Sequence, residues 1–505
     1  MTDNRGTPAQ RPHPGELMTT RRTLLKNSAI LGAGTLSGAL RPVRAARSDR
    51  PNILIIMSDE HDGGVLGCMG NDIISTPHID SIADEGIRLP RCYAAAPVCG
   101  PTRLALTGGK YSSRLRVWGN NSRLPSGPTI ASLMNRAGYQ SILCGKQHYA
   151  KGKLHGFTEI GGQNNKHEKT GYEDRRDPDD ESINTASRDE RFARFEPGRS
   201  SGILNHDDRL TDTTVSFLKD RRAEDPPFFY FLGYKAPHFP LTVPRRYWRK
   251  YRGKVPMPNI PAGSVASQPL NYHHLRRAFG VVETDPTLVR RGRELYYGLI
   301  SWLDNEIGRV LKALAGSEVA ENTVVIFTSD HGENKGDHHL WWKNCMYEHA
   351  TRVPLLVRWP QRWRGGQVRR GACSTLDIVQ TILALGGAST PGDFDGDSLL
   401  PWLDDKKHAW KDLAVSEYYA HNVCSGFSMI RSGPHKYVYH TEINSRYGAE
   451  RELYDLSTDP GELNNLAVGS AALCERLHRA MVAELGAEPD ELEQQCRSDY
   501  SRARR

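Results

Sequence analysis

Four hydrophobic runs along the chain share one design, in which an unbroken apolar segment ends in polar residues. The runs are 52–57, 141–144, 228–232 and 323–327. Unbroken runs of this length are typical of strands buried on both faces, as in parallel α/β sheets. Patterns of helical periodicity separate them, at 79–85, 129–137, 211–222 and 294–314. This alternation predicts an α/β fold with a mostly parallel sheet between two layers of helices.

Two other regions depart from this alternation. Residues 156–210 are rich in Gly, Asn and charged side chains, which predicts a long irregular insertion near the active-site edge of the sheet. From about residue 400 the pattern changes to short strands followed by a helix, at 413–419, 427–431, 436–440, 453–456 and 471–485. We therefore expect a main domain over 47–400 and a smaller C-terminal subdomain over 401–505, built as an antiparallel sheet with a covering helix.

The first 46 residues have the pattern of a targeting segment. Arg21 and Arg22 are adjacent, a weakly apolar stretch rich in Gly, Ala and Ser follows at 27–40, and small residues come next. This order is typical of a twin-arginine export signal, so we expect a protein exported to the periplasm or beyond. The alternative is a disordered basic tail. Because the apolar stretch is short and rich in Gly, Ser and Thr, no stable membrane anchor is expected.

The predicted signal carries much of the positive charge. The chain has a formal net charge of +8, of which +5 belongs to residues 1–45 and only +3 to the rest. Such a small excess gives little support to a nucleic-acid partner, and none is expected. The nine cysteines are scattered without zinc-like spacing. Because twin-arginine export carries proteins that have folded in a reducing compartment, we expect free thiols.

Polar side chains that suit metal ions and anions follow the four predicted strands. They are Asp59 and Glu60, then Lys146 and His148, then His238, and finally Asp330 and His331. Since ligands of open α/β sheets bind beyond the carboxyl ends of the strands, we expect these side chains to converge. Carboxylates from two strands suit Ca²⁺, Mg²⁺ or Mn²⁺ rather than zinc. Cationic side chains beside such a metal, including Lys343, favour a tetrahedral oxyanion such as sulfate or phosphate.

Residues 99–109, Cys-Gly-Pro-Thr-Arg-Leu-Ala-Leu-Thr-Gly-Gly, are hard to explain by structure alone. Pro101 suits the first position of a helix, so Cys99 would lie at a helix N-terminus, where negative charge is favoured. Arg103 would lie one turn further along. A bare cysteine in this position is a candidate for an activated thiolate. The pattern Cys-x-Pro-x-Arg followed by Leu-x-x-Gly also resembles the signature of the type I sulfatases, whose cysteine is oxidised enzymatically to formylglycine.

The resemblance to this family, which belongs to the alkaline phosphatase superfamily, extends over roughly residues 51–466. Its motifs occur in order along the chain, namely Thr76–Asp80, the Lys-x-Pro-His-x-Pro element around His238, Asp330–Glu333, Lys343–Glu348 and Leu453–Leu456. The resemblance implies a large, mostly parallel mixed sheet sandwiched by helices. It also implies hydrolysis of a sulfate monoester of a carbohydrate or another small organic molecule by the hydrated formylglycine.

The family pattern implies a role for each matching position. The ligands of a divalent metal, Ca²⁺ or else Mg²⁺ or Mn²⁺, would be Asp59, Glu60, Cys99, Asp330 and His331. Arg103 would steady the modified side chain, and His148 would hydrogen-bond to it. Lys146 and Lys343 would hold the sulfate oxygens, and His238 would protonate the departing alkoxide. The implied partners are a sulfated substrate and a formylglycine-generating maturation enzyme.

Two residues depart from the commonest family pattern. Glu60 stands where Asp or Gln is more usual, so the metal would be held differently there. His331 replaces the frequent Asn, as in branches that resemble choline sulfatases and phosphonate monoester hydrolases. A phosphonate monoester or phosphodiester hydrolase is therefore the alternative enzyme, and a non-catalytic oxyanion- or glycan-binding protein is an alternative of another class. We expect substrate recognition in residues 156–210, residues 240–290 and the C-terminal subdomain.

Overall fold

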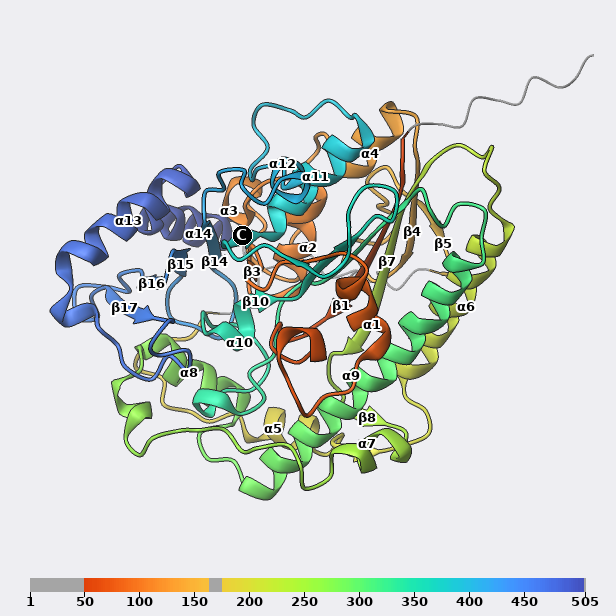
Figure 1. Cartoon of the computed structure of the whole chain (residues 1–505). Helices are drawn as coiled ribbons and strands as arrows, with labels where there is room; N and C mark the ends of the chain where they lie inside the picture. The colour runs from red at the N-terminus through yellow and green to blue at the C-terminus, as the bar shows by residue number, and fades with distance from the viewer. Residues whose placement is uncertain (1–49, 163–174, 504–505) are drawn as a thin grey trace, which may run out of the picture. The chain divides into compact units, whose positions relative to one another are not determined.

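The central strands of the main sheet are the four hydrophobic runs of the sequence. The computed structural model describes residues 50–162 and 175–503, so the predicted export signal lies outside the described residues. Within this part, the main sheet has eight strands in the order β12-β2-β11-β9-β1-β7-β4-β5 (Figure 1). The four central strands are β9 (Thr323–Ser329), β1 (Asn52–Asp59), β7 (Phe228–Pro237) and β4 (Gln140–Gly145). They are adjacent and parallel, as the sequence pattern predicts.

Shorter strands at both edges make the sheet mixed. The strand β5 (Thr158–Ile160) pairs in parallel with β4. On the other side, β11 (Leu355–Arg358) runs antiparallel to β9 and to β2 (Ile87–Arg88), which pairs in parallel with β12 (Gln367–Val368). The expected mostly parallel mixed sheet is therefore confirmed.

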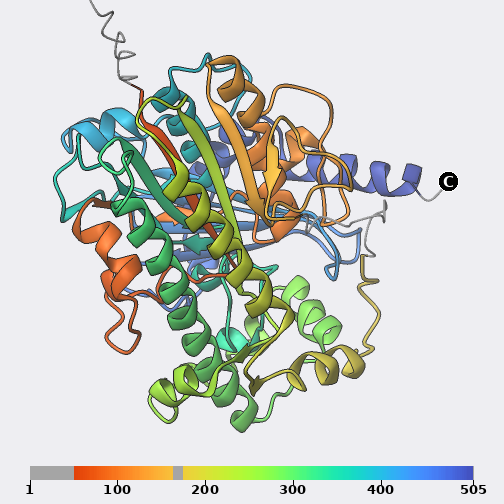
Figure 2. The same ribbon diagram turned by 90° about the vertical axis from the view of Figure 1, so that its right-hand side faces the viewer.

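Helices cover both faces of this sheet, because alternate residues of its strands feed two hydrophobic cores. Leu54 and Ile56 belong to one core, and Ile53 and Ile55 belong to the other. The first core also contains residues of α1 (Pro77–Asp84), α6 (Gly202–Asp220) and α9 (Pro286–Ala315). In Figure 2 the helices α6 and α9 both lie in front of the sheet. The second core contains residues of α2 (Cys99–Gly108), α4 (Ile130–Arg136) and α11 (Thr375–Gly386).

The C-terminal part forms a separate small antiparallel sheet. Its strands follow chain order and are β14 (Leu413–Tyr418), β15 (Phe427–Ser432), β16 (His435–His440) and β17 (Glu450–Asp455). The helix α13 (Ala471–Leu485) packs against them, as predicted (Figure 1). A second helix, α14 (Pro489–Ala503), joins the same core and was missed by the sequence analysis.

The predicted irregular insertion at 156–210 is wrong for about half of the residues that the structure describes there. This stretch contains β5, α5 (Thr185–Phe192), β6 (Glu196–Pro197) and the first turns of α6. Residues 163–174 lie outside the description. Two helices from the region 240–290, α7 (Arg245–Tyr251) and α8 (Leu270–Phe279), follow along the chain. Among the described residues, no helix has the length and apolar character that a membrane span requires.

Candidate active site

The helix α2 places Cys99 at its N-terminal end, deep inside the protein. The helix begins at Cys99 rather than at Pro101, because the preceding Val98 is extended, with φ −162° and ψ 141°. All residues of α2 are buried, and Arg103 is 0 % exposed. The first N–H groups of a helix have no partner within it and give this end a partial positive charge. The predicted location of Cys99 at a helix N-terminus is therefore confirmed.

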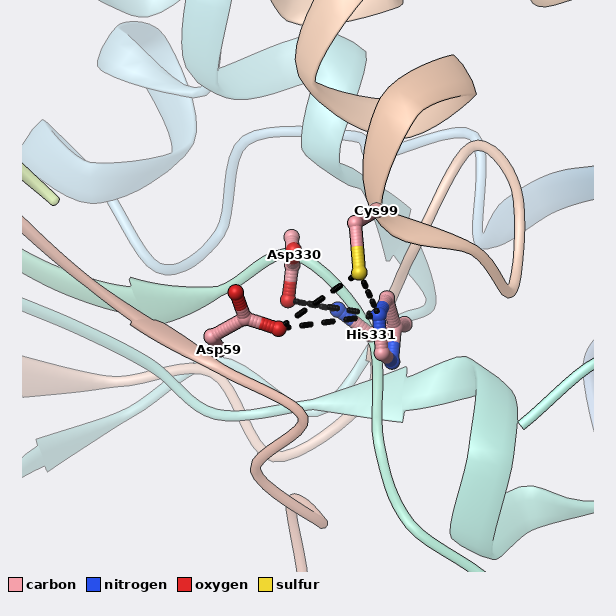
Figure 3. Close-up of side chains that lie close together, drawn as sticks. All are labelled: Asp59, Cys99, Asp330 and His331. Carbon is pink, nitrogen blue, oxygen red and sulfur yellow. Dashed lines mark hydrogen bonds and ion pairs between the residues drawn. The ribbon is translucent and has the colours of Figure 1, made fainter. Parts of the chain in front are cut away.

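Four side chains from three segments converge on one buried space beside the carboxyl ends of β1 and β9 (Figure 3). The Cys99 Sγ atom lies 3.1 Å from His331 Nε2 and 3.6 Å from Asp59 Oδ1. His331 Nε2 lies 3.7 Å from Asp330 Oδ1 and 3.9 Å from Asp59 Oδ1. Each of the four residues offers one ligand atom, and these atoms all lie within 4.8 Å of one another.

This cluster has the donor chemistry of a divalent metal site. Asp59 and Asp330 supply carboxylate oxygens, which Ca²⁺, Mg²⁺ and Mn²⁺ prefer. His331 Nδ1 lies 3.0 Å from the carbonyl oxygen of Gly332, so Nδ1 carries the proton and the Nε2 lone pair faces the cluster. Burial lowers the pKa of His331, which keeps the imidazole neutral as a metal ligand must be. The residues present therefore fit a divalent cation.

The surroundings of the Cys99 thiol favour its protonated form. Burial, reinforced by the neighbouring Asp59 carboxylate, raises the pKa of Cys99 to about 12. The nearby Lys146 and Lys343 oppose this rise without cancelling it. Since the thiolate is the nucleophilic form of cysteine, these surroundings argue against the interpretation of Cys99 as an activated thiolate.

Buried cations compensate the two carboxylates of the cluster. Arg103 Nε lies 2.8 Å from Asp330 Oδ2, and Nη2 lies 3.4 Å from Asp59 Oδ2. Its Nη1 donates to the carbonyl oxygen of Lys146 over 2.7 Å, and the Lys146 ammonium forms an ion pair with Asp59. Burial alone would raise the pKa of Asp59, but the charges of Lys146 and Arg103 hold it well below its usual range. Asp59 is therefore ionised and ready to bind a cation.

A second group, made of Glu60, His238 and Lys343, adjoins the first through Asp59. The Lys343 ammonium lies 3.0 Å from Glu60 Oε2 and 2.9 Å from His238 Nε2. His238 Nδ1 lies 2.6 Å from the Phe239 carbonyl oxygen, so Nδ1 donates there and Nε2 accepts from Lys343. Burial and the Lys343 charge hold the pKa of His238 well below its usual range, which leaves the ring neutral. Burial raises the pKa of Glu60 to about 8 despite Lys343.

Comparison with known proteins identifies the family. The family model described as Sulfatase matches residues 51–388, and the model for N-sulphoglucosamine sulphohydrolase, C-terminal, matches residues 336–488. The chain belongs to the sulfatase family. The predicted family and the predicted enzyme class, a sulfatase, are thereby confirmed.

This sulfatase has relatives of similar length and solved structures of the same fold. An N-acetylglucosamine-6-O-sulfatase of Bacteroides thetaiotaomicron is 27% identical, and the match covers 91% of this chain and 90% of the relative. The phosphonate monoester hydrolase of Agrobacterium radiobacter has a TM-score of 0.70 at 23% identity, over 89% and 96% of the two chains. A structure in complex with its substrate D-glucosamine-2-N,6-O-disulfate has a TM-score of 0.66 at 23% identity, over 89% and 98%.

The predicted site residues of this sulfatase fall into three sets. Asp59, Cys99, Asp330 and His331 form the first cluster, and Arg103 and Lys146 contact it. Glu60 lies in a neighbouring group with Asp59 and His238 and contacts Lys343, and its role as a metal ligand stays a prediction. His148 is buried on the loop after β4, at φ 60°, and is a member of neither group. Its hydrogen bond to the modified side chain stays a prediction.

One residue that organises the site was not assigned a role by the sequence analysis. Glu333 Oε1 accepts the backbone N–H groups of Lys335 and Trp342 over 2.8 and 2.6 Å. These bonds fix the loop that carries Lys343, because Lys343 directly follows Trp342. Burial raises the pKa of Glu333. The motif Asp330–Glu333 was the available signal, but the sequence does not show which backbone groups the carboxylate meets.

Proposed function

We propose that this sulfatase hydrolyses a sulfate monoester of a carbohydrate or another small organic molecule through a hydrated formylglycine formed from Cys99, with a divalent metal ion. One observation carries the proposal. The side chain of residue 99 faces a buried group of metal-type ligands, while lysine and histidine side chains approach from other segments. A thiol whose pKa is raised by burial has no nucleophilic use there, whereas an oxidised side chain has one.

The relatives support a sulfated carbohydrate as the substrate. One is named for the 6-O-sulfate of N-acetylglucosamine, and a protein of the same fold was solved with a glucosamine disulfate as its substrate. Hydrolysis of such an ester releases a sugar alkoxide, which is a poor leaving group and needs a proton donor. The lysine and histidine groups of the site match this requirement.

The absent groups would supply two kinds of chemistry. A divalent ion held by Asp59, Asp330 and His331, with Glu60 alongside, would lower the pKa of a coordinated hydroxyl group and neutralise negative charge. A hydrated aldehyde at residue 99 would supply two hydroxyl groups on one carbon, one as the nucleophile and one as the route to product release.

The remaining steps fall to side chains of the chain itself. Lys146 and Lys343 both act electrostatically on residue 99, which supports a role for their ammonium groups in stabilising the sulfuryl oxygens as these gain charge. The Lys343 ammonium and His238 Nε2 share a hydrogen bond of 2.9 Å, so this pair is the proton source for the departing alkoxide. Arg103 holds Asp59 and Asp330 in register through its two ion pairs. The burial of these groups excludes water and strengthens each interaction.

The test is sulfate release from an aryl sulfate after co-expression with a maturation enzyme. Cys99→Ala should abolish steady release, whereas the control Cys68→Ala, at a half-buried cysteine of a surface turn, should retain it. Wild-type protein made without the maturation enzyme should also be inactive. Unchanged turnover of Cys99→Ala would refute the proposal.

A phosphonate monoester or phosphodiester hydrolase is the second candidate, because His331 occupies the cluster and one solved structure of this fold is such an enzyme. The ratio of kcat/KM for an aryl sulfate to that for an aryl phosphonate monoester separates the two. We expect the sulfate to be preferred. A preference for the phosphonate would identify the protein as a phosphonate monoester or phosphodiester hydrolase instead. Tight binding of sulfate esters without turnover would favour the non-catalytic oxyanion- or glycan-binding protein.

We also propose that the protein is exported and that a maturation enzyme modifies Cys99. Arg21 and Arg22 support export by the twin-arginine route, and the Cys-x-Pro-x-Arg pattern at 99–103 supports recognition by a formylglycine-generating enzyme. Replacing both arginines by lysine should leave the protein in the cytoplasmic fraction. Recovery of that variant in the periplasm would contradict the export route.

A further inference from the structure

Arg191, at the end of α5, lies among three aromatic rings beside the active site. Its guanidinium carbon lies 4.4 Å from the ring centroid of Phe239, 4.5 Å from that of Trp342 and 5.2 Å from that of Phe279. These rings come from the loop after β7, the residue before Lys343 and the end of α8. Cation–π contacts with three rings fix the position of the guanidinium group.

Arg191 forms no ion pair within the part of the chain that the structure describes, although Glu60, Glu190 and Glu333 act on its charge at longer range. Its side chain contacts the three rings, and no described carboxylate lies within ion-pair distance of it. On the same segment, Arg194 pairs with Glu190 over 3.5 Å. The guanidinium N–H groups of Arg191 donate to no acceptor among the described residues, so they are available to an acceptor on a bound molecule.

The ring of Phe239 connects Arg191 to the reacting centre. The imidazole of His238 stacks on this ring, with centroids 4.5 Å apart and an interplanar angle of 24°. The Lys343 ammonium lies 5.9 Å from the same centroid. Arg191 and the proposed sulfate-binding cation Lys343 therefore both lie close to the phenyl ring of Phe239. An anion on Arg191 and a sulfate ester at the reacting centre would fit on one compact molecule.

The cations of the site differ in whether a carboxylate lies next to them. Arg103 and Lys146 form ion pairs with Asp59, and the Lys343 ammonium lies 3.0 Å from Glu60 Oε2. Arg191 adds a further positive charge, half-buried and without a carboxylate partner among the described residues. Taking a guanidinium partly out of water without a counter-charge is unfavourable, and an anion that enters with the substrate removes this penalty.

We propose that Arg191 determines specificity by binding a second oxyanion of the substrate, a sulfate or carboxylate group, next to the sulfate ester that reacts. This inference rests on the proposed function and narrows its substrate to molecules that carry at least two anionic groups. The same cage disfavours a quaternary ammonium substrate such as choline sulfate. Aromatic cages bind such cations, but here a side chain of the protein already fills the cage.

The test compares substrates that differ in one charge. The first set is 3- and 4-carboxyphenyl sulfate, each with its neutral carboxamide analogue, and the second is N-acetylglucosamine 6-O-sulfate against glucosamine 2-N,6-O-disulfate. The first set detects a carboxylate and the second detects a sulfate as the added anion. In at least one set, the dianionic member should have a kcat/KM roughly 10- to 100-fold higher, the size of a charge-assisted hydrogen bond. Choline sulfate should be a poorer substrate than any of them.

Variants test whether Arg191 causes the preference for the dianionic substrate. Arg191→Met should bring the ratio of the two kcat/KM values close to one, mainly through KM, and Arg191→Lys should restore part of it because lysine keeps the charge without the planar fork. The control Arg194→Met, at an exposed position nearby, should leave the ratio as in the wild type. Far-UV circular dichroism and Tm show whether each variant is folded.

The outcomes separate this inference from the proposed function. If the wild type releases no sulfate from any of these esters while its residue 99 is fully converted, the proposed function fails. If it hydrolyses the esters with ratios near one, or if the preference survives in Arg191→Met, the function stands and the inference is overturned. A Tm drop in Arg191→Met with an unchanged ratio would assign Arg191 a packing role only.

Discussion

Replacing Arg103 by methionine should destabilise the protein strongly, because it removes one side of a buried ion-pair network. Arg103, Asp59 and Asp330 are each 0 % exposed, and the pairs measure 2.8 Å and 3.4 Å. Methionine has a similar length but no charge, so the two carboxylates would lose their shared partner. Removing one partner of a buried pair costs about 3–5 kcal/mol, because the remaining charge is left uncompensated. We expect a loss of this size in the free energy of unfolding.

A double variant tests the reasoning behind this magnitude. Asp330→Asn removes one of the stranded charges, so the variant with both replacements should be more stable than the sum of the single effects predicts. The assay is urea unfolding, followed by circular dichroism in the presence of a chelator so that metal binding does not contribute. If the two effects add to within about 0.5 kcal/mol, the carboxylate and the guanidinium are not coupled and the reasoning is refuted.

Three further results are expected. Burial raises the pKa of Asp304 to about 7, so the folded protein holds a proton that the unfolded chain loses near pH 4. Stability should therefore fall between about pH 4 and 7, and Asp304→Asn should flatten this slope in urea unfolding; an unchanged slope would contradict it. Lys436, 0 % exposed, pairs with Glu462 over 2.7 Å, so Lys436→Met should lose about 3–5 kcal/mol, whereas the exposed Arg446→Met should lose under about 1 kcal/mol. Dialysis against EDTA should abolish turnover, with recovery on adding Ca²⁺, Mg²⁺ or Mn²⁺; full activity of the dialysed protein would contradict a metal site.

The centre of the fold could be predicted because burial on both faces leaves a direct mark on the sequence. Residues 53–57 of β1 alternate between the two cores, so this run is apolar, and the polar Ser58 and Asp59 follow it at the carboxyl end of the strand. The parallel arrangement of β9, β1, β7 and β4 then brings their carboxyl ends together. The convergence of Asp59, Asp330 and His331 follows from this geometry.

The elements that were missed are those whose stability depends on contacts from far along the chain. The short strand β5 is held by pairing with β4 rather than by its own hydrophobicity, and its residues are exposed or half-buried. The helix α5 is strongly polar, and only Phe192 of its residues is buried. Propensity and periodicity carry little signal in such segments.

The site itself was predictable in its residue types but not in its pairing. Glu60 was expected with the metal ligands, yet its carboxylate contacts Lys343 and His238. Arg191 offered no motif, because its three ring partners come from segments separated by tens of residues in the sequence. Such groupings depend on tertiary packing, which periodicity does not encode.

The most direct measurement is the mass of the peptide that contains residue 99, followed alongside sulfate release while the level of maturation enzyme is varied. We predict that the aldehyde form of the residue increases with the maturation enzyme and that turnover per molecule rises in proportion, reaching zero where only the thiol is found. Equal sulfate release from protein in which residue 99 is entirely unmodified cysteine would contradict it.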